Sequence, residues 1–176
     1  MQEDYDVEVE WLPFELHPEI PPEGRPVREY IRESYERGIG QRLKQMARES
    51  GREMVLREWT PNSRRALEAS EYAREQGKHE AFHGVVFRKF YGEGQDMSDW
   101  DVLRSAAEEV GLDADEMQRQ TESGKYEPVV DRHVREAHEM GITGVPAYIL
   151  GQRYLIMGAQ PYDVFREVME ELAGGK

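Results

Sequence analysis

Hydrophobic residues recur at helical spacing through the middle of the chain. The clearest stretch lies between residues 78 and 91, where apolar side chains stand at i, i+3 and i+4 and predict a helix with one buried face. Weaker patterns, bounded by Pro, Ser, Asp or Gly, predict helices that begin near Pro26, Gln41, Ser63, Ser98, Asp113 and Glu127. We therefore expect mostly helix from residue 26 to residue 140.

The two ends of the chain follow a different pattern. Residues 6–14 alternate in part, with Val7, Val9 and Trp11 on one side, which predicts a strand. Near the other end, two apolar runs, 145–150 and 153–157, flank Gly151 and Gln152, a pair suited to a type II′ hairpin turn. A last amphipathic helix begins at Pro161. This order predicts an α/β fold whose base, residues 1–25 and 141–176, is split by a helical insertion at residues 26–140.

Composition narrows the function classes. The chain has 176 residues and a net charge of -13, which argues against a surface for nucleic acid or anionic lipid. No apolar stretch approaches the roughly 18 residues that a membrane span needs. The first ten residues are acidic and lack the order of a secretion signal, so we expect a cytoplasmic protein. The chain contains no cysteine, which excludes disulfides and thiolate metal sites, and no cofactor is expected.

Several segments, in this order along the chain, resemble one known family. They are Val9–Leu16, Pro61–Ser63, Ala73–Gly77, Gly144–Leu150 (Gly-Val-Pro-Ala-Tyr-Ile-Leu) and Gly158–Pro161. The set is similar to the DsbA-like thioredoxin superfamily, and most of all to its FrnE-like branch. The resemblance implies a thioredoxin-like fold with a large helical insertion. It also implies protein thiol-disulfide oxidoreduction.

The resemblance also implies that a segment is missing. In such proteins a first strand and a Cys-x-x-Cys helix precede the strand that is similar to Val9–Trp11, and this sequence starts after them. We expect the sequence to be a fragment or a truncated gene product. No catalytic residue is assigned, and no thiol redox activity is expected, because the thiolate is the nucleophile of that reaction.

The same resemblance identifies candidate substrate-binding residues. A Val145-Pro146 bond in the cis form would expose the preceding backbone to an extended substrate, with Thr143 and Gly144 beside it. The alternative is an ordinary trans proline that begins an edge strand. Asn62 corresponds to a polar residue near the pocket of such proteins, and its alternative role is to cap a helix.

His79, Glu80 and His83 form the letters His-Glu-Ala-Phe-His, the H-E-x-x-H pattern of zinc-dependent hydrolases. In that alternative the two histidines would bind zinc together with a third, distant ligand, and the glutamate would act on a metal-bound water. The apolar stripe on the same helix and the family resemblance favour no metal.

Two further functions stay open. One is a glutathione-dependent isomerase of the 2-hydroxychromene-2-carboxylate type, and the other is a non-catalytic client-binding module that uses the apolar edge beside Pro146. The isomerase would act with glutathione on an aromatic carboxylate, and the client-binding module would bind a polypeptide. As partner of the chain, the resemblance implies a polypeptide or thiol substrate. Loss of the first strand would leave a gap beside the strand after Pro146. The strands on its two sides could pair directly, or another copy of the chain or an N-terminal partner segment could fill it.

Overall fold

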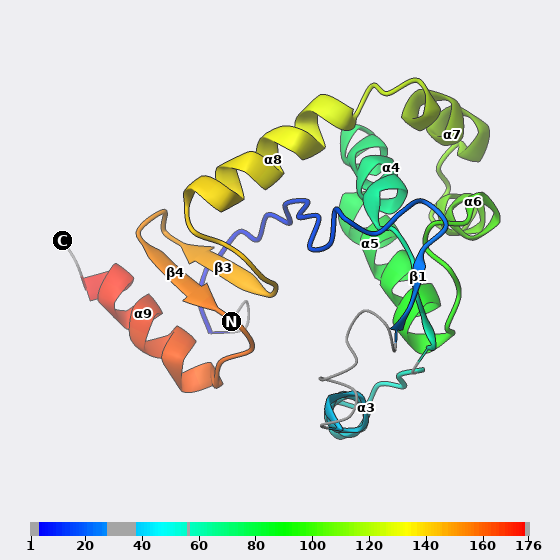
Figure 1. The fold of residues 1–176 in the computed structure, drawn as a ribbon. Helices are drawn as coiled ribbons and strands as arrows, with labels where there is room; N and C mark the ends of the chain where they lie inside the picture. Colours follow the sequence, from blue (N-terminus) through cyan, green and yellow to red (C-terminus); the bar gives the residue numbers. More distant parts are fainter. Residues whose placement is uncertain (1–3, 28–37, 56, 175–176) are drawn as a thin grey trace. The chain divides into compact units, whose positions relative to one another are not determined.

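The computed structural model describes residues 4–27, 38–55 and 57–174, and its chain divides into two units (Figure 1). The helical unit comprises residues 17–131, and the terminal unit comprises residues 1–16 and 132–176. These boundaries differ from the predicted ones near residues 25 and 140. Ile20 is buried and its carbonyl accepts a hydrogen bond from Asn62 at 2.6 Å, which ties residues 17–24 to the helical unit.

In the helical unit, α4 packs against α5 and α7, and α6 packs against both α5 and α7. Its elements are β1 (Arg25–Pro26), α3 (Ile39–Glu49), β2 (Trp59–Thr60), α4 (Arg64–Glu75), α5 (His79–Phe87), the π-helix η1 (Arg88–Gly92), α6 (Trp100–Glu109), α7 (Ala114–Glu122) and the start of α8 (Glu127–Glu139). Alanines line the buried faces of α4 and α6, which lets the helices approach closely. Phe82 of α5, Leu103 of α6 and Met117 of α7 are fully buried in the core that these helices form with α4.

Several predicted helix starts are confirmed, including those near Glu127 and Pro161, and one predicted cap is corrected. The Asp113 carboxylate accepts a hydrogen bond from the Glu116 backbone N–H at 2.9 Å, as expected for the cap of α7. Helix α4 begins after Ser63, as predicted. The predicted cap Ser98 is wrong, since the neighbouring Asp99 caps α6 by accepting from the Asp101 N–H.

Two other predicted segments need comment. Residues 25–26 pair with residues 59–60 as the short antiparallel sheet β1–β2, and the next residue, Val27, is helical as predicted. The rest of the helix predicted after Pro26, including Tyr30 and Ile31, lies outside the described residues. In the helix predicted at 78–91, Phe82, Val86 and Phe90 are buried as expected, while Ala81 is exposed.

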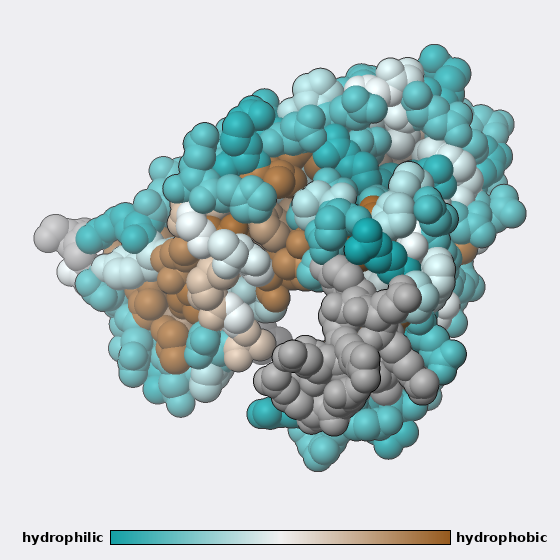
Figure 2. All heavy atoms as spheres, viewed as in Figure 1, coloured by the Kyte–Doolittle hydropathy of each residue, from teal (hydrophilic) through white to brown (hydrophobic). Residues whose placement is uncertain are grey.

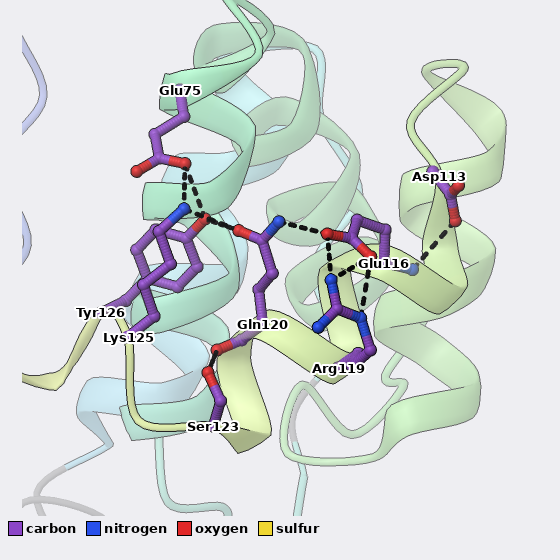
Figure 3. Close-up of polar contacts among 8 residues, drawn as sticks. All are labelled: Glu75, Asp113, Glu116, Arg119, Gln120, Ser123, Lys125 and Tyr126. Atoms are coloured by element: carbon purple, nitrogen blue, oxygen red, sulfur yellow. Dashed lines mark hydrogen bonds and ion pairs between the residues drawn. The ribbon is translucent and has the colours of Figure 1, made fainter.

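A polar network ties α4 to α7 and to the start of α8 (Figure 3). The Tyr126 hydroxyl lies 2.9 Å from Glu75 Oε2 and 2.7 Å from Gln120 Oε1, and Lys125 Nζ donates to the same two oxygens at 2.7 Å. Burial raises the pKa of Tyr126 to about 12, so it stays a neutral donor. The network holds the ring of Tyr126 in the core, where it packs edge-on against Tyr72.

The terminal unit is a hairpin covered on one face by a helix. Strand β3 (Ala147–Leu150) pairs antiparallel with β4 (Tyr154–Met157), and α9 (Tyr162–Gly174) follows. The Tyr148 and Phe165 rings meet edge-on at 4.9 Å, which places α9 against the Tyr148 face of the hairpin.

The hairpin turn differs from the predicted type II′. Both Gly151 and Gln152 have a φ of +56°, the sign that a type I′ turn requires at both central positions. A Cβ at residue 151 would also lie 2.8 Å from Leu172. The backbone conformation favours glycine at residue 151, and a side chain there would have to displace the tip of Leu172 on α9.

The predicted strand at residues 6–14 is wrong. Residues 6–14 belong to neither sheet. Within the described residues, β3 pairs only with β4. Direct pairing of the segment with β3, one of the two expected outcomes, is therefore not observed. The alternating pattern lies within the segment itself. A segment forms a β-strand, however, only when a neighbouring strand pairs with its backbone N–H and C=O groups.

Candidate functional site

The predicted substrate-binding residues of the terminal unit form one exposed loop between α8 and β3. Gly141, with a φ of +78°, ends the helix, and the buried Ile142 anchors the loop. Thr143 and Pro146 are exposed, and Val145 is 53% exposed. The Val145-Pro146 peptide bond is cis, which confirms the prediction for it.

Strand β3 directs part of its backbone away from β4. The Gly158 N–H donates to the Pro146 carbonyl at 2.7 Å, which fixes the alternation of the ladder. Tyr148 and Leu150 are therefore the residues that exchange hydrogen bonds with β4, and Ala147 and Ile149 point their N–H and C=O groups to the opposite edge. No backbone bond to these two residues is formed from that edge by residues 4–27, 38–55 or 57–174. This outer edge of β3 follows directly after Pro146.

Apolar side chains surround the outer edge. Ile149 and its cross-strand neighbour Leu155 lie on the hairpin face opposite α9, and they are 43% and 42% exposed. Tyr148 and Val145 are also exposed. Figure 2 shows apolar surface gathered over β3, β4 and the adjoining part of α9. An unpaired backbone edge beside exposed apolar side chains can bind an extended polypeptide by strand addition.

Asn62, the remaining predicted substrate-binding residue, lies in the helical unit and not in this loop. Its Nδ2 donates to the Ile20 carbonyl, and its Oδ1 accepts from the Arg64 N–H at 2.8 Å. The side chain thus joins the chain before β1 to the first turn of α4. The bond to the Arg64 N–H forms an Asx turn just before α4, whose N-cap is Ser63, so these contacts are structural without being the predicted cap.

The His79, Glu80 and His83 pattern lies at the start of α5. His79 Nε2 is 3.2 Å from Arg74 Nη2, and because arginine can only donate, this nitrogen accepts and is not a free metal ligand. The two imidazole rings stack at 5.9 Å. In the described part of the chain, no group of three or more His, Cys, Asp or Glu side chains could hold a metal ion. The zinc alternative gains no support there.

The two histidines are held in the neutral form. Burial, aided by the charge of Arg74 and by His83, lowers the pKa of His79 to about 4. Burial also lowers the pKa of His83, against the opposing charge of Glu80. The stack continues along the helix through Phe87 and Tyr91, at 4.2 and 5.4 Å between ring centroids. His79, His83, Phe87 and Tyr91 follow one another at intervals of four residues. Because side chains four residues apart are neighbours on a helix, this spacing could have predicted the stack.

Comparison with known proteins agrees with this geometry. Residues 1–170 match the model of a family described as the DSBA-like thioredoxin domain. The chain belongs to the DsbA-like thioredoxin family. The predicted fold class is thereby confirmed, while membership of the FrnE-like branch stays a prediction.

Two relatives extend over nearly the whole chain. An uncharacterized protein of Bacillus subtilis, YwbO, is 33% identical over 173 residues, which are 94% of this chain and 82% of YwbO. The crystal structure of a probable DsbA oxidoreductase from Streptomyces coelicolor superposes with a TM-score of 0.80 at 26% identity. The superposition covers 93% of this chain and 74% of the Streptomyces coelicolor chain. None of the described helices of our chain has the length and apolar character to cross a membrane.

A second group of similar proteins bears the name of a different enzyme. A 2-hydroxychromene-2-carboxylate isomerase of Sphingobium xenophagum is 35% identical over 78 residues, 44% of this chain and 40% of the isomerase. The structure of an enzyme of that name superposes with a TM-score of 0.67 at 23% identity, over 82% of this chain and 68% of its own. This second likeness concerns the fold alone.

Proposed function

We propose that this chain is the polypeptide-docking part of a DsbA-type thiol-disulfide oxidoreductase and that it exchanges no disulfides by itself. The exposed loop that ends in the cis Val145-Pro146 bond, with the apolar surface of β3 beside it, carries the proposal. Family membership supports the type of partner, a polypeptide. The sequence supports the second half of the proposal, because it contains no cysteine.

The chemistry of a complete oxidoreductase explains why docking and exchange separate here. A cysteine thiolate attacks one sulfur of the substrate disulfide, a mixed disulfide forms, and the other substrate sulfur leaves as a thiolate. A second cysteine thiolate then attacks the mixed disulfide and releases the substrate. Every covalent step needs a thiolate, whereas alignment of the extended substrate needs only backbone groups and an apolar surface.

We predict that this chain does not accelerate disulfide reduction. Reduction of insulin by dithiothreitol should proceed at the uncatalysed rate when the purified chain is added, because the chain offers no nucleophilic sulfur. Turbidity of the released insulin B chain measures the rate, and a DsbA-type enzyme with both cysteines serves as the positive control. A rate that rises with the concentration of the chain would contradict the second half of the proposal.

Docking has its own test, and Ile149→Asp is the variant for it. A charge beside the outer edge of β3 should weaken binding of a labelled, cysteine-free unfolded polypeptide by about tenfold, since the carboxylate would lose water on binding. The matched control is Leu43→Asp, which changes a side chain of similar exposure on α3 in the helical unit. Fluorescence anisotropy gives both affinities. Equal affinities for the two variants would contradict docking at β3.

A further inference from the structure

Helix α3 of the helical unit is amphipathic and is closed by a local motif (Figure 1). Gly51, with a φ of +68°, ends it in a Schellman motif, in which the Arg52 N–H donates to the Ala47 carbonyl at 2.9 Å. Leu43 and Met46, three residues apart on one face, are 45% and 46% exposed. Among the described helices and strands, none packs extensively against α3. Its apolar stripe, Leu43 and Met46, is therefore left partly open.

The same helix concentrates positive charge. Residues 38–52 contain a single acidic side chain, Glu49, in a chain whose net charge is -13. Their basic side chains are Arg42, Lys44, Arg48 and Arg52. None of these four forms an ion pair with another residue that the structure describes. Elsewhere in the helical unit arginines are paired with carboxylates, as Arg88 is with Glu109 at 2.6 Å.

The helix dipole explains only part of this charge. Arg48 and Arg52 lie at the carboxyl end of α3, where positive side chains are favourable. Arg42 and Lys44 lie in its first half and gain no such benefit. As the sequence neighbours of Leu43, they lie about 100° to either side of it around the helix. An apolar stripe with positive charge on both sides is complementary to a stripe with negative charge on both sides.

Charge decides among the occupants that this face could have. A second copy of α3 would bring the same positive charges to the interface, and like charges oppose association. Nucleic acids and anionic lipid surfaces are negative, but they extend well beyond a helix of 11 residues and would meet the acidic remainder of the chain. A single acidic helix contacts α3 without that repulsion.

We propose that α3 binds an amphipathic helix of another polypeptide, with an apolar stripe flanked by Asp or Glu. The stripe of the partner covers Leu43 and Met46, as in a pair of coiled-coil helices, and its carboxylates face Arg42 and Lys44. This interaction is separate from the docking beside Pro146, because an unfolded polypeptide presents no such stripe.

Two synthetic helical peptides test the charge of the partner. Each has about three heptads, with Leu at the a and d positions and either Glu or Lys at e and g. In fluorescence anisotropy at about 20 mM salt, the glutamate peptide should bind at least about tenfold more tightly than the lysine peptide, and the difference should shrink at about 0.5 M salt. The net charge of -13 by itself favours the lysine peptide, so the sign of the difference reports a local site. Equal binding, or tighter binding of the lysine peptide, would overturn the proposal.

Charge-reversal variants locate the site. Arg42→Glu with Lys44→Glu should weaken binding of the glutamate peptide at least about tenfold. The matched control, Arg132→Glu with Arg135→Glu, makes the same change of charge at two exposed positions of α8 and should weaken it much less. Equal losses in the two variants would mean a general effect of net charge and would overturn the assignment to α3.

Two further measurements test other covers of the stripe. Met46→Gln keeps a good helix former and should weaken peptide binding while the Tm stays within about 2 °C of the parent's, as for a surface substitution. A larger fall in Tm would mean that the stripe packs inside the chain. A dimer in light scattering that Arg42→Glu with Lys44→Glu dissociates would identify a second copy as the occupant. Binding to phosphatidylglycerol vesicles without binding to the glutamate peptide would identify a membrane. Each of these three results would overturn the proposal.

Discussion

Replacing Phe82 with alanine should lower the free energy of unfolding of the helical unit by about 3–5 kcal/mol. The side chain is fully buried within the cluster formed by α4, α5, α6 and α7. Truncation would remove its contacts and leave a cavity that alanine-lined helices cannot close without moving. Urea unfolding followed by circular dichroism at 222 nm measures the change, because most of the helix lies in this unit.

Phe87→Ala is the matched control for this experiment. The two phenylalanines stand on the same helix, but Phe87 is 49% exposed. Its ring packs against those of His83 and Tyr91 in the aromatic stack, so its loss should cost about 1 kcal/mol or less. Equal effects of the two substitutions would mean that the core of the helical unit is not where the structure places it.

Acidification from pH 7 to pH 4 should destabilise the helical unit through His79, and His79→Gln should remove that part of the loss. The pKa of this histidine is lowered to about 4 in the folded state, against 6.5 for the free side chain. Between those values the unfolded chain binds more protons, so stability is full above about pH 6.5 and falls as the pH drops towards 4. Because His79 is partly exposed, we expect about 1–2 kcal/mol from it.

The variant His79→Gln isolates this effect from other titrating groups. Glutamine can still accept the hydrogen bond from Arg74 but carries no proton in this range. Acidification stabilises the folded state through Glu68, whose pKa is raised, and destabilises it through Glu75, whose pKa is lowered. The contribution of His79 is therefore read from the difference in stability between the variant and the parent. We expect nearly equal stability at pH 7 and a flatter profile for the variant below pH 6.5. Parallel profiles would contradict the lowered pKa.

Local signals predicted much of the helical unit. The spacing of Phe82, Val86 and Phe90 correctly predicted a buried helix face, and Asp113 with Glu116 correctly predicted the start of α7. These features depend on residues within one or two turns of each other, which the sequence displays directly. Ser98 and Asp99 are both capping residue types at adjacent positions, and the choice between them depends on how the loop enters α6.

Longer-range features were harder to predict. The alternation of Val7, Val9 and Trp11 predicted a strand, yet pairing depends on a neighbour that the local sequence does not display. For the candidate site, the family resemblance led to the loop at 143–146 and to the cis bond. The unpaired groups of Ala147 and Ile149 became visible only through the register of β3 against β4.

The outer edge of β3 also has a consequence for the colloidal behaviour of the protein. An uncovered apolar strand edge is a template for edge-to-edge aggregation. At neutral pH the net charge of -13 keeps molecules apart, but that protection vanishes near the isoelectric point, about 4.9. The chain should therefore be handled well above that pH and at modest ionic strength, where electrostatic repulsion between molecules opposes aggregation.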